Sequence, residues 1–437
     1  MTSLLNLLGL PKLTRKEMKV EFVAGLTTFL TMAYIVFVNP SILSTPQTGM
    51  VYGGVLTATV LLSFLMTLFM GLYAKLPFAV APGMGINAFF TFTLILGNHI
   101  EWQLALGMVF WSGILFLIIS VTGIREGILR AIPTNLRVAI SVGIGLFLTF
   151  IGLKNMGFIQ AHPATLVTLG KITPRIVISL MAMAIMFYFL KKKNPLAFLI
   201  GMVVATVVSL AFGFVSLPPS WFSAPDFESV AMRMNVWGAL KLSLLPSIIS
   251  LMFTDLFDSI STFMGVSRAC GLVDKNGEPK NMKQGLLVDA FATLIGGPLG
   301  TSSGTAYIES AAGIEVGGRT GWTSVFTALF FLPCLFLAPI AKIIPTEATS
   351  PVLVIVGFMM FRSVKEIETE KWEEALPAFL SLILIPLTFS ITQGILWGFL
   401  SHVCLFTLVG RARDVSRPMW AVSFVCLILL IIENGSR

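Results

Sequence analysis

Long apolar stretches recur along the whole chain and are separated by short polar connections. A helix needs about 20 apolar residues to cross the hydrocarbon core of a bilayer. About fourteen stretches are expected to cross as helices, at residues 20–38, 52–74, 78–96, 102–121, 135–153, 174–190, 195–214, 242–262, 284–296, 304–316, 322–341, 350–361, 376–391 and 393–410. An apolar tail at 418–433 is either a fifteenth crossing or an interfacial helix. The pattern predicts an all-α integral membrane protein.

The longest polar connection divides these crossings into two sets of seven. The predicted parts are a cytoplasmic N-terminus (1–19), a first repeat (20–214), an extracytoplasmic connector (215–241), a second repeat (242–410) and a basic segment with an apolar tail (411–437). Because seven is odd, the second set must enter the membrane in the opposite sense. Ile132-Pro133-Thr134 recurs as Ile344-Pro345-Thr346, and the glycine-containing stretch around Gly145 recurs around Gly357 at the same offset of 212 residues. These features predict 7+7 inverted repeats.

Each half contains one apolar segment that glycine and proline interrupt. The first runs from Leu76 to Phe90 and contains Pro82, and the second runs from Gly296 to Glu309 and contains Pro298. A continuous helix tolerates neither proline nor this density of glycine. We expect each segment to be a short extended strand followed by a half-helix that begins near mid-membrane, where irregular backbone must line a cavity or be buried in protein. Two facing half-helix N-termini would suit a polar planar ligand.

Composition supports the membrane assignment. Apolar residues make up 56% of the 437 residues, charged residues only 11%, and the mean hydropathy is +0.91. A soluble domain has about 25% charged residues, so this chain could not cover a surface in water. The four cysteines are scattered without C-x-x-C spacing, which argues against metal or disulfide use. No cofactor is expected, apart from a proton as coupling ion.

The net charge of +8 is explained by its placement. With the N-terminus in the cytoplasm, 22 of the 29 Lys and Arg residues fall on cytoplasmic segments, among them Arg125, Arg130, Lys275 and Arg411. This is the positive-inside bias, which sets orientation and does not indicate a nucleic-acid partner. Lys12 to Lys19 precede a first apolar run that continues into the bundle, so no cleavable signal peptide is expected. A multi-pass protein of the cytoplasmic (inner) membrane is predicted.

Ionisable residues inside the apolar stretches are the candidate chemistry. Asp255 and Asp258 stand three residues apart on one helix face, and Glu309 is expected one turn into the half-helix of the second broken segment. Each such group costs about 2.5–3.5 kcal/mol at the centre of a membrane helix, so a substrate or ion site is the default interpretation. Two carboxylates this close should not both be ionised. One of them would then hold a proton, which is what proton coupling needs. The structural alternative is that an acid merely pairs with a neighbouring helix. For a fourth acid, Asp289, a structural hydrogen bond to the neighbouring broken segment and a role in coupling are equally supported.

Uncharged residues of the broken segments complete the predicted site. Asn87 carries an amide that can donate and accept, in the first half-helix. Gly85 allows a close approach of the backbone to a ligand or to another helix. The predicted substrate-binding residues are Asp258, Glu309, Asn87, Gly85 and Thr305, and the predicted proton-coupling residues are Asp255, Asp258 and Glu309. Aromatic residues such as Tyr307 could stack on a flat ring, although packing is their more frequent role.

Several of these motifs resemble the AzgA-like purine permeases, a group of nucleobase–cation symporters that share the uracil-permease fold. The similar runs are Ala24–Met32, Ala81–Phe90, Leu256–Ser259, Gly300–Ser310 and Val316–Gly321. The run from Ala81 to Asn87 is similar to the adenine-type members. One departure is the pair Ser261-Thr262, where the family usually has glycine and threonine; a side chain added there would either narrow the pocket or alter its specificity.

The resemblance implies a core domain of helices 1–4 and 8–11 and a gate domain of helices 5–7 and 12–14. A purine would lie between the third and tenth segments, with Asp258 and Glu309 on its N–H groups and Asp255, Gly85 and Asn87 in support. It also implies proton symport and a homodimer.

Three alternatives remain open from the sequence. A sulfate or bicarbonate transporter of the same broad fold is opposed by three acids in the site. A membrane prenyltransferase would use Asp255-x-x-Asp258 to hold magnesium, but the chain has no second aspartate-rich cluster at membrane depth. A passive channel would be excluded by saturable accumulation against a gradient.

Overall fold

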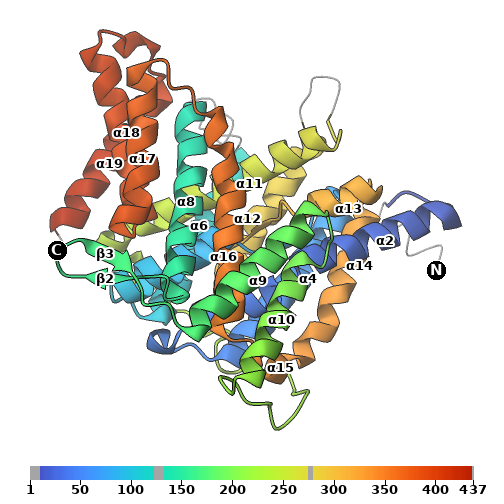
Figure 1. Ribbon diagram of the computed structural model, residues 1–437. Coiled ribbons are helices and arrows are strands. Elements are labelled where there is room, and N and C mark those ends of the chain that lie inside the picture. Colours follow the sequence, from blue (N-terminus) through green and yellow to red (C-terminus); the bar gives the residue numbers. More distant parts are fainter. Residues whose placement is uncertain (1–9, 123–131, 274–278, 436–437) are drawn as a thin grey trace.

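The chain folds into a helical bundle with two short strand pairs (Figure 1). Its computed structural model describes residues 10–122, 132–273 and 279–435. The predicted cytoplasmic residues Arg125, Arg130 and Lys275 lie outside these ranges, as do residues 1–9 and 436–437. Within the described ranges, eight helices are long and apolar enough to cross a membrane, and several shorter apolar helices accompany them. The predicted all-α membrane architecture is therefore confirmed.

The first half contains the seven predicted crossings. The first is divided into two helices at Ala33–Tyr34, and the third is a strand followed by a half-helix. The elements are α2 (Arg15–Met32), α3 (Ile35–Leu43), α4 (Tyr52–Phe69), β1 (Val80–Pro82), α5 (Met84–Ala88) with its π-helical continuation Phe89–Gly97, α6 (Trp102–Thr122), α8 (Thr134–Asn155), β2 (Ile159–His162), β3 (Leu166–Leu169), α9 (Pro174–Lys191) and α10 (Ala197–Ala211). The exposed β2–β3 hairpin was not predicted.

The second half repeats this order, again with a strand before a half-helix. Its elements are α11 (Leu245–Ala269), α12 (Met282–Leu299), β4 (Gly304–Ala306), α13 (Ser310–Val316), α14 (Gly321–Phe331), α15 (Ala338–Ile343), α16 (Thr346–Phe361), α17 (Trp372–Thr388) and α18 (Ile391–Leu408). The predicted crossing at 322–341 is interrupted by a 3-10 turn that contains Pro333. The apolar tail forms α19 (Arg417–Gly435), and Ser423 donates a hydrogen bond to the carbonyl of Phe399 in α18.

The helices pack as two groups, as the resemblance implied. Helices α2–α6 and α11–α14 pack mainly on one another and form the core group. Helices α8–α10 and α16–α18 form the gate group, with α8 and α16 side by side at its centre (Figure 1). At that crossing, a Cβ on Gly145 would lie 2.6 Å from the carbonyl oxygen of Gly357, so the two backbones touch. These glycines are the pair related by the 212-residue repeat, and each belongs to the corresponding helix of its half.

The two broken segments meet inside the core group. Strand β1 pairs antiparallel with β4, with Val80 opposite Ala306 and Pro82 opposite Gly304. Short extended strands before half-helices were predicted, and this pairing satisfies backbone groups that would otherwise be exposed at mid-membrane. The second half-helix begins at Ser310, so the prediction that Glu309 lies one turn inside it was wrong. Glu309 is the residue immediately before the helix, because α12 continues through Gly296 and Pro298 to Leu299 and β4 begins only at Gly304.

One buried acid has a purely structural environment. Glu21 of α2 is 4% exposed and accepts hydrogen bonds from the backbone N–H groups of Arg319, Thr320 and Thr323, each at 3.1 Å. These N–H groups lie at the start of α14, where a helix has unsatisfied donors and a positive dipole end. Glu21 therefore fixes the start of α14 on α2.

Candidate functional site

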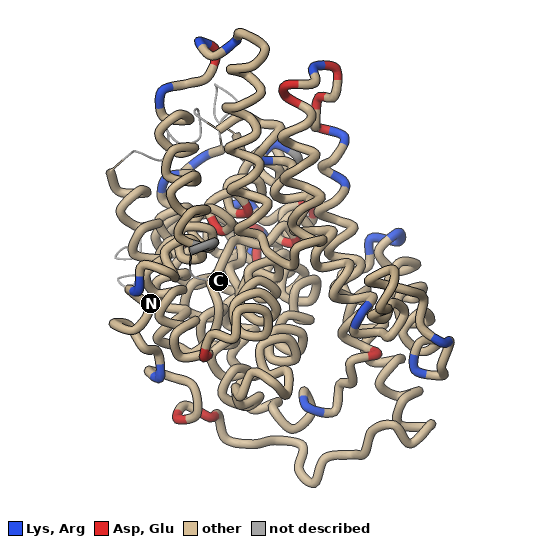
Figure 2. The backbone as a smooth tube through the Cα atoms, turned by 90° about the vertical axis from the view of Figure 1, so that its left-hand side faces the viewer, with Lys and Arg blue, Asp and Glu red and all other residues tan. Residues whose placement is uncertain are grey.

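The candidate site lies where the β1–β4 pair faces α11 and α12. Figure 2 shows acidic positions in the middle of the bundle, away from the lysines and arginines at its ends. All four intramembrane acids named from the sequence come from this region: Asp255 and Asp258 on α11, Asp289 on α12, and Glu309 immediately before α13. Their environments differ, and the differences divide them by role.

Asp255 of α11 is completely buried, and it contacts the loop that precedes β4. Its Oδ2 accepts hydrogen bonds from Ser303 Oγ at 2.5 Å and from Thr293 Oγ1. These two hydroxyls also lie 2.6 Å from each other. Its second oxygen, Oδ1, has no hydrogen-bond partner among the described residues. Asp255 thus ties α11 to α12 and to the loop that precedes β4.

Asp289 occupies a similar buried position on α12. Its Oδ2 accepts a hydrogen bond from Ser259, and Ser259 Oγ lies 2.8 Å from the Thr305 Oγ1. Thr305 is 2% exposed, and its backbone pairs with Ala81. The side chain of Thr305, predicted to bind substrate, therefore faces the hydroxyl of Ser259 in α11.

Asp258 lies one turn beyond Asp255 and is partly exposed. No hydrogen bond within the described residues involves its carboxylate. It lies within electrostatic range of Glu309. The exposed residues Ser261, Gly265 and Arg268 continue the same side of α11 toward its C-terminal end. Asp258 is thus a free carboxylate at the end of an accessible strip of small and polar residues, which includes the Ser261 that departs from the family pattern.

Glu309 is partly exposed and is held by the first helix pair. Tyr34, between α2 and α3, donates a hydrogen bond from its hydroxyl to Oε1 of Glu309 at 2.6 Å. Thr31 Oγ1 lies 3.5 Å from the backbone carbonyl oxygen of Glu309. The phenol engages only Oε1 of this carboxylate.

Asn87 is the polar residue of the first half-helix and is completely buried. Its Oδ1 accepts a hydrogen bond from Ser302 in the loop before β4. Its amide nitrogen has no partner among the described residues. Asn87 therefore joins the two broken segments and keeps a free N–H donor at their junction.

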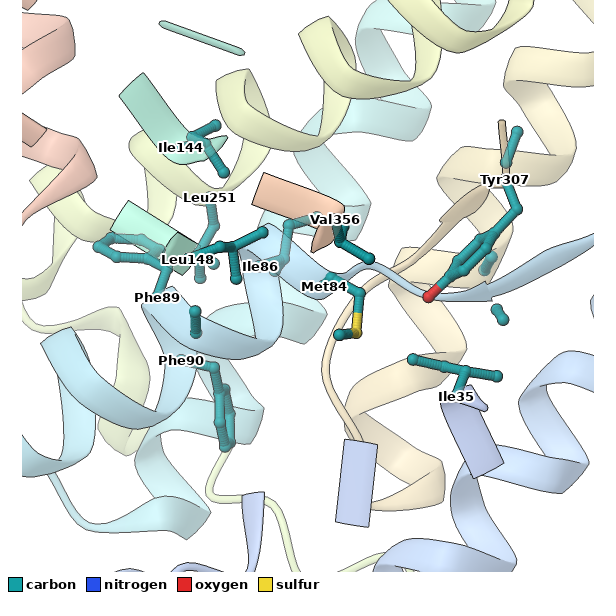
Figure 3. Packing of buried hydrophobic residues seen from close by; sticks show 14 of the residues in the cluster. Ile35, Met84, Ile86, Phe89, Phe90, Ile144, Leu148, Leu251, Tyr307 and Val356 are labelled. Atoms are coloured by element: carbon teal, nitrogen blue, oxygen red, sulfur yellow. The ribbon is translucent and has the colours of Figure 1, made fainter. Parts of the chain in front are cut away.

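Gly85 permits a close approach of the two helix groups. A Cβ at Gly85 would collide with the Cγ2 atom of Ile144 in α8. Figure 3 shows the neighbouring Ile86 beside Leu148 of α8 and Leu251 of α11. Of the two roles that the sequence allowed for this glycine, close packing against a helix is the one that the contacts favour.

Several polar residues of this region were not identified from the sequence. They are Tyr34, Ser259, Thr293, Ser302 and Ser303, which hold the acids and the amide in place. Tyr307 was considered for ring stacking, but its buried hydroxyl donates to the carbonyl of Pro82 at 2.5 Å, and Figure 3 shows its ring turned toward that strand. For Ser302 and Ser303, the sequence did contain a signal, because the run Thr301-Ser302-Ser303 between two glycines places several hydroxyl groups in the second broken segment.

The region contains carboxylate acceptors from α11 and from the residue before α13, and the unpartnered amide of Asn87 in the first half-helix. A flat heterocycle with N–H groups and ring nitrogens matches such a set of partners. Within the described ranges, no three His, Cys, Asp or Glu side chains converge as a metal site would require.

Comparison with known proteins identifies the family. The Xan_ur_permease profile, described as a permease family, matches residues 19–396. The chain is 44% identical to a putative permease from Methanocaldococcus jannaschii, with 96% of each chain covered. It is 38% identical both to the adenine permease AdeP from Escherichia coli, covering 95% of this chain and 94% of that one, and to the guanine/hypoxanthine permease PbuG from Bacillus subtilis, covering 94% and 96%.

A solved structure has the same fold at low sequence identity. The transmembrane domain of the cyanobacterial bicarbonate transporter BicA superposes with a TM-score of 0.66 at 16% identity, covering 89% of this chain and 98% of that one. This fold is the 7+7 inverted-repeat arrangement predicted from the sequence. Since the family profile covers most of the chain and the relatives are permeases over nearly their full length, this protein is a transporter of the xanthine/uracil permease family.

Proposed function

We propose that this protein imports a purine nucleobase across the cytoplasmic membrane by proton symport with alternating access. The observation that carries the proposal is the free, partly exposed carboxylate of Asp258 within electrostatic range of Glu309. Asp258 lies on α11, which contacts β4, and Glu309 follows β4 in the chain. A carboxylate left without a partner at membrane depth indicates a ligand or ion site.

Purine recognition follows from the hydrogen-bonding groups that remain available. Asp258 and the second oxygen of Glu309 would accept from N–H groups of the base, while the free amide of Asn87 would donate to a ring nitrogen. Thr305 and Gly85 would support the site: Thr305 through its contact with the hydroxyl of Ser259, and Gly85 through its close contact with Ile144. Adenine is favoured because the Ala81–Asn87 run is similar to the adenine-type members, with hypoxanthine and guanine as further substrates.

Proton coupling is assigned to Asp255, Asp258 and Glu309. A proton taken up from outside by one of these acids would reduce the repulsion among them and favour the loaded state. Its release to the cytoplasm would favour the return of the empty carrier. The core group would move as a unit against the gate group, because each group packs mainly within itself.

Orientation and assembly complete the proposal. The N-terminus and the basic segment after α18 are placed in the cytoplasm and the 215–241 connector outside, in accordance with the positive-inside bias. We further propose a homodimer, as the family resemblance implies. The lipid bilayer and the purine are the other partners, and no nucleic acid is involved.

Anion transport is the second candidate, since the bicarbonate transporter shares the fold. The acids at the junction oppose it. An anion there would be attracted by the half-helix dipoles but repelled by Asp258 and Glu309, and neither acid has a basic partner in the described residues.

The test is uptake of labelled adenine by cells that lack their own purine carriers. Concentrative uptake that a protonophore abolishes, that persists when choline replaces sodium, and that unlabelled adenine competes away is the expected result. Competition by hypoxanthine and guanine ranks the substrates. No uptake of any purine by protein shown to be in the membrane would refute the assignment, and uptake of bicarbonate or sulfate instead would favour the second candidate.

A further inference from the structure

Tyr34 joins the first membrane helix to the acid of the second broken segment. It is 1% exposed, and it stands at the interruption between α2 and α3. Its hydroxyl donates to Oε1 of Glu309 at 2.6 Å. The partners are separated by 275 residues in the sequence, so this contact exists only in the folded bundle.

The half-helix that follows Glu309 is seated firmly on α2, the helix that precedes Tyr34. A Cβ on Gly313 of α13 would lie 2.5 Å from the carbonyl oxygen of Ala24 in α2. The Thr31 hydroxyl reaches the backbone of Glu309 from the same face. With the backbone fixed in this way, the remaining freedom of Glu309 is the direction of its side chain, which the phenol sets.

The ring of Tyr34 also touches the other helix group. Its centroid lies 4.6 Å from that of Phe198, near the start of α10, with an interplanar angle of 51°. Phe198 is 3% exposed, so this aromatic contact is buried. Aromatic pairs at this spacing attract beyond the burial of their area. A continuous path of contacts therefore runs from α10 of the gate group through Tyr34 to the Glu309 carboxylate.

We propose that Tyr34 is a positioning residue. Its hydroxyl holds Glu309 in the orientation that receives the purine, and its ring transmits the position of α10 to that carboxylate. The inference rests on the proposed function, because that assigns Glu309 to the purine. When the gate group moves away from the core group, the ring contact is lost and Glu309 is free to turn. The purine is then held tightly in only one arrangement of the two groups.

The test is a double-mutant cycle on purified protein in proteoliposomes, with labelled adenine. Tyr34→Phe keeps the ring and removes the hydroxyl, and we expect KM to rise roughly tenfold with kcat within about twofold, in the range for a hydrogen bond to a charged group. Phe198→Ala keeps the hydroxyl and removes the ring contact, and should raise KM about threefold by the same route. If Phe198 acts through Tyr34, the double variant is no worse than Tyr34→Phe alone.

The matched control is Tyr52→Phe. Tyr52 is another core-group tyrosine. Its hydroxyl donates to the carbonyl of Ala341 at a distance of 3.0 Å, and this hydrogen bond involves none of the acids. A KM for Tyr34→Phe equal to that of Tyr52→Phe would overturn the positioning role. Independent, additive effects of Tyr34→Phe and Phe198→Ala would overturn the link to the gate group. Thermal unfolding in detergent identifies a variant that fails to fold, in which case Phe198→Leu replaces Phe198→Ala.

A second readout does not require any purine. Dicyclohexylcarbodiimide modifies accessible membrane carboxyl groups, and mass spectrometry of the digested protein measures its reaction at Glu309. Release of Glu309 should increase this labelling in both Tyr34→Phe and Phe198→Ala, and unchanged labelling would contradict the inference. Failure of the wild-type protein to carry any purine would refute the proposed function alone, and the labelling would still decide the role of Tyr34.

Discussion

The two broken segments have equivalent backbones but different chemistry. Each consists of a short strand and a half-helix, and the strands pair antiparallel at Val80–Pro82 and Gly304–Ala306. The first segment carries no charge and is buried along its whole length, with the Asn87 amide as its polar group. The second ends in a partly exposed carboxylate, Glu309, that the first helix pair holds by its side chain and its backbone.

This difference indicates what the repeat supplies and what it does not. The duplicated backbone provides two half-helix starts at mid-membrane, which are equivalent for any ligand. Specificity requires unlike partners, and here one segment keeps an unpartnered N–H donor while the other presents a carboxylate that accepts from Tyr34. A ligand with both acceptors and donors at its edge can engage the two segments at once. The site is therefore asymmetric within a nearly symmetric frame.

The largest expected effect comes from removing the charge of the second segment. Glu309→Gln keeps the shape of the side chain but removes its charge, and purine uptake should fall by roughly 100-fold, the upper range for a hydrogen bond to a charged group. Glu315→Gln is the matched control, because Glu315 lies on the same half-helix in an exposed ion pair with Lys193. Transport assays on both variants decide. Equal uptake by the two would mean that the charge at residue 309 is not part of the site.

The structural role of Asp255, which ties α11 to the loop before β4, should be separable from the role of Asp258 in transport. Asp255→Asn leaves two hydroxyl donors against a weaker acceptor in a buried site, so we expect a loss of about 1–3 kcal/mol in unfolding free energy. Asp258→Asn disturbs no hydrogen bond of the described residues and should lower transport strongly, though less than Glu309→Gln, at wild-type stability. Thermal unfolding in detergent, paired with uptake, measures both. A destabilised Asp258→Asn beside an unaffected Asp255→Asn would reverse the roles.

The first segment should show a smaller effect on affinity. Asn87→Ala removes the free amide donor and leaves the Ser302 hydroxyl without its acceptor, so the KM for the purine should rise roughly tenfold. Ser302→Ala is the comparison variant, because it removes the same internal hydrogen bond but keeps the donor. Similar KM values for the two variants would show that Asn87 acts only through Ser302.

The smallest effect is expected where the first segment meets the gate group. Gly85→Ala places a methyl group against Ile144, and overpacking of a buried contact costs about 1–3 kcal/mol unless the neighbour is smaller. Uptake should fall a few-fold, and the second substitution Ile144→Ala should restore it. If the double variant remains impaired, Gly85 contacts the purine directly and not the helix alone.

Much of the frame could be predicted because it depends on local sequence. A strand and a half-helix form within the Leu76–Phe90 run, as its glycines and prolines indicated. In the Gly296–Glu309 run the strand and half-helix also form, but α12 first continues through Gly296 and Pro298 to Leu299. The 212-residue offset correctly identified α8 and α16 as corresponding helices of the two halves. The start of α13 was misplaced because Gly300, and not Gly296, ends α12, and because the pairing with β1 places the strand at Gly304–Ala306.

The details of the site depended on contacts that the sequence does not contain. Asp255 and Asp258 look alike as neighbours on one helix, and only the positions of Ser303 and Thr293 distinguish a buried tether from a free carboxylate. Tyr34 lies in an apolar helix among many aromatic residues, and its function in the structure comes from a partner in the other half of the chain.

The glycine contact between α8 and α16 has a consequence for the history of the chain. Gly145 and Gly357 occupy equivalent positions of the two repeats, and each lies against the backbone of the other. Equivalent residues that meet across an interface are the mark of isologous, twofold assembly. A half-length ancestor with seven helices would have made this contact between two copies, with one glycine serving twice. The fusion of those copies would have freed the remaining equivalent positions to diverge, while this pair kept a shared steric requirement.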